Sequence, residues 1–526
     1  MNGADMLCDV LLVNGIDVCF ANPGTSEMHF VAALDRKPDM RCILGLSEGV
    51  VTGAADGYGR MAGKPAATLL HCGPGLANGL ANLHNARRAR TPMLNVVGDH
   101  ASYHLQFDAP LTTDIEALAR PMSRWVGRAS GAGDLRLRAE EGIAAALARR
   151  GPSTLILPAD AAWSEIEPEP SAGSSSEPLS AIQTPPAEPL DLKAVDAAAK
   201  ALRSGARAAL FLTGQALREE ATLIAGRIAE ATGAKLFSQT SGRYQRGAGR
   251  VNVRQVPYKI DLAVEALKDI DLAICLGSPQ PVGFFAYPGK PGLMLPKGCT
   301  VLQLAYHEQD LVEALAALAD ALSLAADAPV TLNRLCQEDI AEPGDGSLTA
   351  DAISLMVARR LPEQAIVIDE ALTSIGQTHF LHHMLPPHDV LPLTGGAIGI
   401  GVPLATGAAI AAPDRKVVAL QADGSGLYNV QALWTQAREN LDVLTIVFAN
   451  NAYRILQGEM TGVGVNAYGR NASRMLGLDQ PSIDWCALAK GFGVESGSAS
   501  SITEFRRLLE AGLSRRGPFL IQALIE

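Results

Sequence analysis

The chain has 526 residues, of which 48% are hydrophobic and 19% charged, and a formal net charge of −11. This length is too great for one hydrophobic core and predicts about three domains, at roughly 150 residues each. The acidic balance argues against a nucleic-acid-binding protein. No stretch reaches the ~20 uninterrupted apolar residues that a membrane span needs, and the N-terminus lacks a signal-peptide pattern. We therefore expect a cytoplasmic protein without nucleic-acid or membrane partners.

Short apolar runs alternate with helical patterns over residues 1–163. Strands are expected at residues 18–20, 41–46, 66–70, 93–97 and 154–157. Such alternation is typical of a parallel sheet wrapped by helices. Residues 164–190 are rich in Pro, Ser and Glu, and this composition predicts a linker.

Two further segments repeat the alternation. Residues 191–326 predict strands around 208–212, 235–237, 272–276 and 300–304. A loose stretch at 327–346 predicts a second linker, and residues 347–526 predict strands at 365–368, 417–420, 444–448 and 519–523. The predicted fold class is therefore α/β, with three doubly wound parallel-sheet domains.

Acidic and amide side chains follow two strands of the third segment. Asp423-Gly424-Ser425 follows the first, and Asn450-Asn451-Ala452 follows the second, with a helix expected at 428–440 between them. Open α/β sheets bind ligands at the carboxyl ends of their strands, and Mg²⁺ prefers an oxygen shell shared with phosphates. We predict a magnesium–diphosphate site with ligands from Asp423, Asn450 and the Ala452 carbonyl, and with Gly424 and Ser425 beside the phosphates.

This clamp resembles that of the thiamine diphosphate (ThDP) enzymes, the family of acetolactate synthase, pyruvate decarboxylase and benzoylformate decarboxylase. Ala422 replaces the first glycine of the family's Gly-Asp-Gly. Counting from Asp423 favours Asn450 as the second metal ligand, whereas matching the family's Asn-Asn doublet favours Asn451. We choose Asn450. The resemblance covers nearly the whole chain and implies pyrimidine-binding (1–163), central (191–326) and diphosphate-binding (347–526) domains.

Two N-terminal motifs carry the catalytic assignments. Glu48, in Leu-Ser-Glu-Gly-Val, resembles the family's cofactor-activating glutamate, which implies a hydrogen bond to N1′ of the aminopyrimidine. In isolation it would be an ordinary first-turn helix charge. His71 resembles the active-site histidine of benzoylformate decarboxylase and suits proton transfer near neutral pH; the alternative is a strand-end side chain bonded to backbone. The following turn, Gly73-Pro74-Gly75 to Asn78, resembles a cofactor-contacting turn of acetolactate synthases.

Four residues are assigned to the substrate. Thr25 and Ser26 lie in a loop that resembles the family's Pro-Gly loop, and either side chain can donate to a substrate carboxylate; helix N-capping is the equal alternative. His100 lies near the position at which relatives contact substrate. The alternative for this residue is a structural role. Benzoylformate decarboxylase has a second active-site histidine where this chain has Phe284, so one protonation partner is missing there.

The remaining cofactor contacts also come from the resemblance. Gly396 would offer its carbonyl to the 4′-amino group, and Ile398 would hold the bend between the two cofactor rings. Thr373 or Ser374 would contact the diphosphate side, unless they cap the next helix. Acetolactate synthases carry FAD in the central domain, but Gly214 belongs to no full Gly-x-Gly-x-x-Gly. A catalytic FAD is not expected, and a structural FAD stays open.

The resemblance implies a ThDP- and Mg²⁺-dependent enzyme that decarboxylates a small 2-oxo acid. The product is then joined to a second carbonyl compound, as in acetolactate synthase, or protonated, as in benzoylformate decarboxylase. A catalytically silent regulatory paralogue is the alternative from another class, and the presence of Glu48 and Asp423 argues against it. The two cofactor-binding segments belong to different subunits in relatives, so we expect a homodimer or homotetramer with active sites at the dimer interface.

Overall fold

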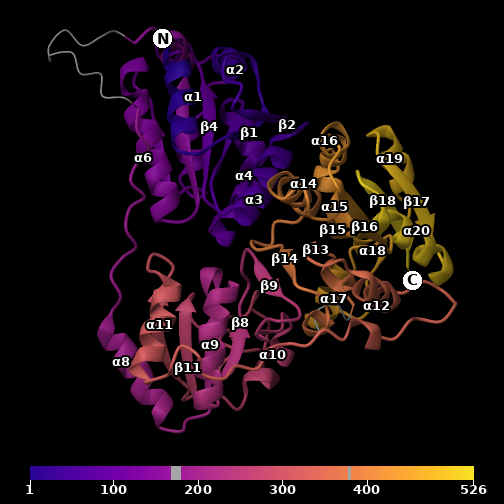
Figure 1. Cartoon of the computed structure of the whole chain (residues 1–526). Coiled ribbons are helices and arrows are strands. Elements are labelled where there is room, and N and C mark those ends of the chain that lie inside the picture. Colours follow the sequence, from indigo (N-terminus) through magenta and orange to yellow (C-terminus); the bar gives the residue numbers. More distant parts are fainter. Residues whose placement is uncertain (167–178, 377–380, 526) are drawn as a thin grey trace.

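The computed structural model describes residues 1–166, 179–376 and 381–525, so part of the expected 164–190 linker lies outside the described residues. Three sheets of mainly parallel strands, each covered by helices, follow one another along the chain (Figure 1). The predicted fold class is thus confirmed. Within the described part, no helix is both long and apolar enough to cross a membrane.

The first sheet has six strands, all paired in parallel, in the order β2-β1-β3-β4-β6-β5. Its strands are β1 Val18–Asn22, β2 Arg41–Leu44, β3 Ala66–Leu70, β4 Met93–Asp99, β5 Trp125–Arg128 and β6 Pro152–Pro158. Its helices are α1 Gly3–Val13, α2 Met28–Asp35, α3 Glu48–Ala62, α4 Cys72–Ala89, α5 Ile115–Ala119, α6 Leu135–Ala148 and α7 Ala159–Trp163. Strand β2 stops short of the expected residue 46, because the chain turns there to begin α3.

The central sheet has five strands in the order β10-β8-β7-β11-β12. They are β7 Ala208–Leu212, β8 Lys235–Ser238, β10 Arg254–Gln255, β11 Leu272–Gly277 and β12 Thr300–Tyr306. The helices around them are α8 Leu192–Arg203, α9 Glu219–Thr232, α10 Ile260–Leu267 and α11 Leu311–Ala321. The proposed domain boundaries stay predictions.

The third sheet has seven strands in the order β17-β18-β16-β15-β13-β14-β9. They are β13 Ile366–Glu370, β14 His388–Pro392, β15 Val417–Ala422, β16 Val443–Ala449, β17 Glu495–Ala499, β18 Phe519–Leu524 and β9 Tyr244–Arg246, which joins antiparallel from the central segment. The helices include α12 Ala350–Arg360, α14 Gly401–Ala411, α15 Asp423–Gly426, α16 Ala432–Arg438, α17 Arg454–Gly462, α18 Arg470–Leu476, α19 Trp485–Gly491 and α20 Ile502–Ser514.

The helix expected at 428–440 is wrong in its bounds. Helical structure begins at Asp423 with α15, passes through a 3-10 turn at Leu427–Asn429, and ends with α16 at Arg438. Small residues permit this early start, since Gly424 and Gly426 are packed against Tyr453 and Trp485, where larger side chains would not fit. Asp423 therefore lies at the first turn of a helix, directly after β15.

The first and third domains share one hydrophobic core through α3 and α14. Val51, Ala54 and Ala55 of α3 belong to the same buried cluster as Leu404 and Ala408 of α14. The two helices approach so closely that a Cβ on Gly57 would collide with the Leu404 carbonyl. Small residues on both helices therefore fix how the domain that carries Glu48 sits on the domain that carries Asp423.

A buried arginine connects all three domains. Arg60, on α3, is 4% exposed and forms an ion pair with Asp56 at 2.5 Å. Its guanidinium also donates to the Gly242 carbonyl of the central domain at 3.3 Å. In the third domain it donates to the Pro392 carbonyl at 2.7 Å and to the Thr394 hydroxyl at 3.1 Å. Each of these acceptors is held in place by the same side chain.

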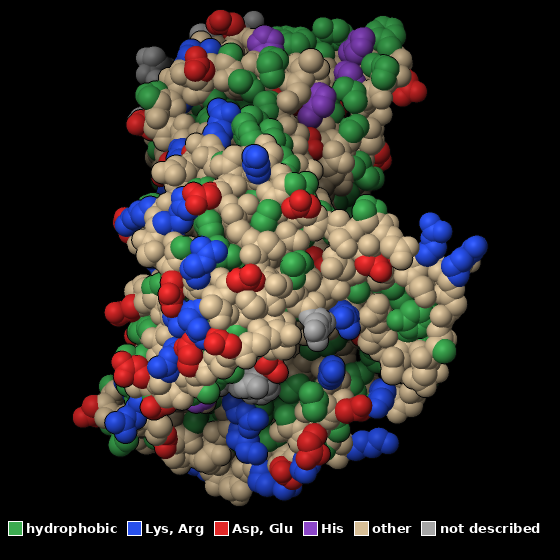
Figure 2. All heavy atoms as spheres, turned by 90° about the vertical axis from the view of Figure 1, so that its right-hand side faces the viewer, with side chains coloured by type: hydrophobic (Ala, Val, Ile, Leu, Met, Phe, Trp, Pro, Cys, Tyr) green, Lys and Arg blue, Asp and Glu red, His purple; other side chains and the backbone are tan. Residues whose placement is uncertain are grey.

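Figure 2 shows mixed acidic and basic side chains over much of one face of the molecule, and histidine and hydrophobic side chains gathered at its upper end. That end is formed by the first domain, as in Figure 1. Among the described residues of this domain, Tyr103 and Phe107 are large hydrophobic side chains that are 63% and 66% exposed. Exposed apolar side chains that lie close together are typical of surfaces that contact other proteins.

Candidate active site

Glu48 is the first residue of α3 and lies in a buried position. Its side chain is 5% exposed, and its Oε2 accepts a hydrogen bond from the Asn78 amide of α4 at 3.0 Å. Ser47 caps the helix instead, because its hydroxyl accepts from the Gly49 N–H at 3.2 Å. Ser47 is therefore the cap, and Glu48 is an acidic residue in the first turn of α3, the position that the alternative interpretation also predicts.

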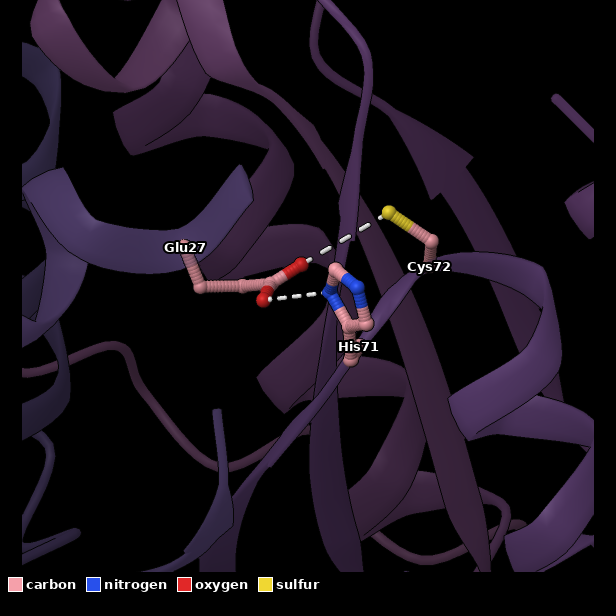
Figure 3. Close-up of side chains that lie close together, drawn as sticks. All are labelled: Glu27, His71 and Cys72. Atoms are coloured by element: carbon pink, nitrogen blue, oxygen red, sulfur yellow. Dashed lines mark hydrogen bonds and ion pairs between the residues drawn. The ribbon is translucent and has the colours of Figure 1, made fainter. Parts of the chain in front are cut away.

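His71 directly precedes α4 and is paired with Glu27, an acid to which the sequence analysis assigned no role. Its Nδ1 lies 2.9 Å from Oε2 of Glu27, and the Glu27 side chain is fully buried (Figure 3). The same Oε2 accepts from the Gly24 N–H at 2.8 Å. This pairing fixes the ring orientation of His71 and directs Nε2 away from the carboxylate, as in other acid–histidine pairs.

Glu48 and His71 lie on two sides of one glycine. A Cβ added to Gly75 would be 2.8 Å from Oε1 of Glu48 and 3.2 Å from Cβ of His71. Gly73-Pro74-Gly75, which the sequence suggested as a turn, forms the first turn of α4 itself, and Gly75 lies between the Glu48 carboxyl and Cβ of His71. Gly73, at the start of the turn, is likewise packed against Thr113, at 2.5 Å from where its Cβ would be.

Of the residues assigned to the substrate, Ser26 lies next to the residue that follows His71. Ser26 accepts a hydrogen bond from the Cys72 thiol at 3.4 Å, while Thr25 is exposed. His100 follows β4, and its Nε2 is buried without a hydrogen-bond partner in the described part of the chain. A buried polar nitrogen of this kind requires an explanation, and a missing ligand supplies one.

Asp423 and Asn450 lie together at the carboxyl ends of β15 and β16. The two carboxylate oxygens of Asp423 accept from the backbone N–H groups of Gly424 at 2.8 Å and Asn451 at 2.7 Å. Burial raises the pKa of Asp423 above its usual value. The Asp423 side chain is 2% exposed, and no cation pairs with it among the described residues. A divalent cation would remove this cost of burying a carboxylate.

Ser374 connects the predicted diphosphate contacts to the metal ligands. The Asn450 amide donates to its hydroxyl at 3.4 Å, and Asn450 Oδ1 accepts from the Ala452 N–H at 3.0 Å. Asn451 instead uses its backbone, with its N–H on Asp423 and its carbonyl accepting from Leu478 at 2.7 Å. This arrangement favours the Asn450 side chain as the second ligand.

The glycine-rich loop at 394–401 is held from two sides. Asn85 of α4 accepts from the Gly395 N–H at 3.1 Å and donates to the Ala397 carbonyl at 2.7 Å. Gly396 has φ +77°, a conformation that suits glycine, and its missing Cβ would be 2.7 Å from the ring of Phe284. Ile398 is half-buried. Phe284 therefore lies directly over the backbone expected to contact the aminopyrimidine.

Glu370, to which the sequence analysis assigned no role, accepts hydrogen bonds from the backbone of the same loop. Its carboxylate accepts from the Gly399 and Gly401 N–H groups, both at 2.5 Å, and from the Gln421 amide at 3.1 Å. Burial raises its pKa to about 7. The Gln421 amide also donates to the Ser425 hydroxyl at 2.7 Å, so the Ser425 side chain faces the interior. Thr373 is exposed.

The site residues thus form an N-terminal group around Glu48 and His71 and a C-terminal group around Asp423 and Asn450. Across the described parts of the chain, no hydrogen bond joins one group to the other. Phe284 and Gly396 form a third set. The loop that contains Gly396 is bonded to α4, because Asn85 donates to the Ala397 carbonyl.

Comparisons with known proteins identify the family of the chain. Models of the N-terminal and C-terminal thiamine pyrophosphate (ThDP) binding domains match residues 1–118 and 374–523. The chain belongs to the thiamine pyrophosphate enzyme family, as the resemblance predicted, and it is an enzyme.

Individual relatives span the whole chain. A Mycobacterium tuberculosis protein, provisionally named as an acetolactate synthase large subunit, is 45% identical over 100% of this chain and 99% of its own. Benzoylformate decarboxylase of Pseudomonas aeruginosa is 28% identical over 98% of this chain and 97% of its own. The solved 4-hydroxybenzoylformate decarboxylase of Rhodococcus jostii has the same fold, with a TM-score of 0.81, 23% identity and full coverage of both chains.

Proposed function

We propose that the protein is a ThDP- and Mg²⁺-dependent enzyme that decarboxylates a small 2-oxo acid. The observation that carries this proposal is the position of Glu48 and His71 beside Gly75, where an added Cβ would lie 2.8 Å from Oε1 of Glu48 and 3.2 Å from Cβ of His71. The chain belongs to the thiamine pyrophosphate enzyme family, and this membership supports ThDP as the cofactor of the proposed site.

The donor set at the C-terminal group fits the diphosphate end of the cofactor. Asp423, the Asn450 amide and the Ala452 carbonyl supply oxygen ligands of the kind that Mg²⁺ prefers. Gly424 and Ser374 lie beside them. Thiamine diphosphate, when bound, supplies a carbanion that adds to the 2-oxo group and accepts the electrons released with carbon dioxide.

The protein's own residues control protons and water. The buried Glu48 carboxyl, oriented by Asn78, donates or accepts a proton at the aminopyrimidine. His71, oriented by Glu27, exchanges a proton with the substrate oxygen or carbon. Phe284 and Ile398 exclude water above Gly396. Thr25, Ser26 and His100 would hold the carboxylate of the substrate.

The fate of the decarboxylated product separates two versions of the proposal. Joining to a second carbonyl compound gives a 2-hydroxy ketone, the acetolactate synthase-like outcome that we favour from the Gly-Pro-Gly turn. A non-ligating decarboxylase is the second candidate, and the His71–Glu27 pair favours it because that pair can deliver a proton.

We also propose that two chains complete each site. The N-terminal and C-terminal groups of a single chain are not bonded to each other in the described structure, and Tyr103 and Phe107 of the first domain are exposed. A homodimer, or a homotetramer of two such dimers, would place the groups of one chain against those of another. Light scattering that detects an active monomer would contradict this assembly.

The test uses purified protein with ThDP and Mg²⁺, and it measures carbon dioxide release from pyruvate and from benzoylformate. Mass spectrometry of the products separates aldehydes from 2-hydroxy ketones. Calorimetry of ThDP uptake, with and without Mg²⁺, provides a readout that does not depend on the choice of substrate. If the protein takes up no ThDP, the proposal is wrong; uptake without turnover of any 2-oxo acid in a broad screen would favour a regulatory paralogue.

A further inference from the structure

Three side chains that bind metals converge on one point of the N-terminal group. They are Glu27, from the 3-10 turn before α2, and His71 and Cys72, at the start of α4 (Figure 3). One ligand atom from each lies within 4.8 Å of the other two. This cluster differs from the magnesium clamp in kind, because it combines a thiol, an imidazole and a carboxylate.

The distances from the two Glu27 oxygens to the imidazole nitrogen and to the thiol sulfur bracket the spacing expected around a tetrahedral metal. Around an ion with Zn–N and Zn–O bonds near 2.0 Å and a Zn–S bond near 2.3 Å, neighbouring ligand atoms lie about 3.3–3.6 Å apart. In the structure, His71 Nδ1 and Glu27 Oε2 are 2.9 Å apart, and Cys72 Sγ and Glu27 Oε1 are 3.8 Å apart. Small side-chain rotations convert the hydrogen-bonded cluster into a coordination shell, with the ion in place of the bridging protons.

Backbone packing holds the ligands in position. A Cβ on Gly24 would collide with the His71 ring, and a Cβ on Gly98 would collide with the Glu27 carboxylate. The Gly24 N–H also donates to Glu27 at 2.8 Å. Since the surroundings already fix the carboxylate and the ring, binding an ion would cost little conformational entropy at these two side chains.

Access and ligand type favour a soft ion with one open coordination position. Glu27 and Cys72 are fully buried, whereas the His71 side chain is 23% exposed. An ion would therefore enter past His71 and keep a fourth position for water, as zinc does in sites with three protein ligands. Thiolate and imidazole ligands select Zn²⁺ over Mg²⁺.

We propose that Glu27, His71 and Cys72 form a zinc-binding site that is separate from the magnesium clamp, and that the ion inhibits the enzyme by replacing the hydrogen bond between His71 Nδ1 and the Glu27 carboxylate. The inhibitory part rests on the proposed function, because it requires His71 to transfer protons. The binding part rests only on the geometry of the three side chains.

Binding of the ion must displace the thiol proton. Burial raises the pKa of Cys72 to about 12, so the free site holds a neutral thiol at neutral pH. Coordination replaces that proton with the ion, and one proton leaves for each thiolate formed.

The first experiment measures metal binding directly. The full-length protein, loaded with ThDP and excess Mg²⁺, is dialysed against Zn²⁺, and the bound zinc is counted by atomic emission. We expect one zinc per chain, and at least tenfold weaker binding in Cys72→Ala, since loss of a direct ligand costs no less than loss of a supporting contact. Cys8→Ala is the matched control, because Cys8 is an equally buried thiol of the same domain outside the cluster.

A spectroscopic readout identifies the ligand. Co²⁺ in place of Zn²⁺ should give a thiolate-to-cobalt charge-transfer band in the wild type and in Cys8→Ala, but not in Cys72→Ala. If the alanine variant does not fold, Cys72→Ser provides the same comparison with a hydroxyl of similar size. A wild type without the band, or a band that survives in the Cys72 variants, would overturn the proposal.

Activity measurements complete the test. Saturating Zn²⁺ should lower turnover at least tenfold in the wild type and leave Cys72→Ala unaffected. A protein that shows the cobalt band but decarboxylates no 2-oxo acid retains the zinc site and loses only the proposed function. Equal inhibition of wild type and Cys72→Ala would place the inhibitory ion elsewhere.

Discussion

The two groups of the candidate site are built in different ways. In the N-terminal group, side chains hold side chains: Asn78 positions Glu48, and Glu27 positions His71. In the C-terminal group, backbone N–H groups hold the Asp423 carboxylate. The His71–Glu27 pair can transfer a proton, whereas the Asp423 carboxylate is held by backbone N–H groups that do not titrate. We therefore expect substitutions in the first group to reduce the rate and those in the second to reduce cofactor affinity.

Glu48→Gln should have the largest effect. The amide keeps the size of the side chain and can still bond to Asn78, but it cannot exchange a proton. We expect kcat to fall by about 10²–10⁴-fold, the usual contribution of acid–base catalysis, while the affinity for ThDP changes little. Steady-state kinetics together with calorimetry measure both. The control is Glu165→Gln, whose side chain is 85% exposed, and wild-type turnover in Glu48→Gln would refute the assigned role.

Asp423→Asn should have the opposite effect, a large loss of ThDP affinity with a smaller loss of turnover. The variant loses the buried negative charge that would face the cation, which we expect to weaken Mg²⁺-dependent ThDP binding about 100-fold or more. Turnover at saturating cofactor should fall less than in Glu48→Gln. Calorimetry with and without Mg²⁺ measures the change, and Asp414→Asn, at an exposed position of the same domain, serves as the control. Unchanged affinity in Asp423→Asn would move the metal site to other residues.

Glu27→Gln should lower kcat, by less than Glu48→Gln does. Loss of a charged hydrogen bond costs roughly 1.5–3 kcal/mol, or about 10–100-fold in rate, when the bond acts in the transition state. The KM for the 2-oxo acid should stay near the wild-type value, because Glu27 is buried behind His71. A variant in which KM rises and kcat does not would show that Glu27 shapes the substrate pocket instead of positioning the ring.

Glu370→Gln should affect stability and its pH dependence more than turnover. The folded protein holds this carboxyl at a pKa of about 7, above its value in the unfolded chain. The folded state therefore binds the extra proton between about pH 4.5 and 7, and the free energy of unfolding falls by up to about 3 kcal/mol as the pH rises through that window. Glu370→Gln has no carboxyl at this position, so it lacks this pH-dependent contribution to the free energy of unfolding. Urea unfolding at pH 5 and pH 7 should show a smaller decrease for Glu370→Gln than for the wild type.

The sequence predicted the three sheets because their central strands are continuous apolar runs between helical patterns. It missed strands that lack this signal. Strand β14, at His388–Pro392, begins with two polar residues and ends with proline, and β17, at Glu495–Ala499, contains mostly small and polar residues at a sheet edge. Strand β9 could not be foreseen as part of the third sheet, because its partner lies about 140 residues away along the chain.

The same limit applies to the site. Glu48, His71 and Asp423 were found because each lies within a local motif. Glu27 and Glu370 were missed because neighbours in sequence give them no partner. Glu27 meets His71 only through the parallel pairing of β1 and β3. Glu370 meets Gly399 only where the 394–401 loop passes over β13. Such roles depend on contacts between distant segments, which a single sequence does not encode locally.

The buried guanidinium of Arg60 has a consequence for motion within one subunit. Because it is bonded to acceptors in all three domains, a hinge that separated any two of them would leave a charged group partly unsolvated inside the protein, which is strongly unfavourable. The three domains should therefore move as one rigid unit during a catalytic cycle. Opening for substrate entry and product release is then left to short surface segments and to the relative movement of whole subunits.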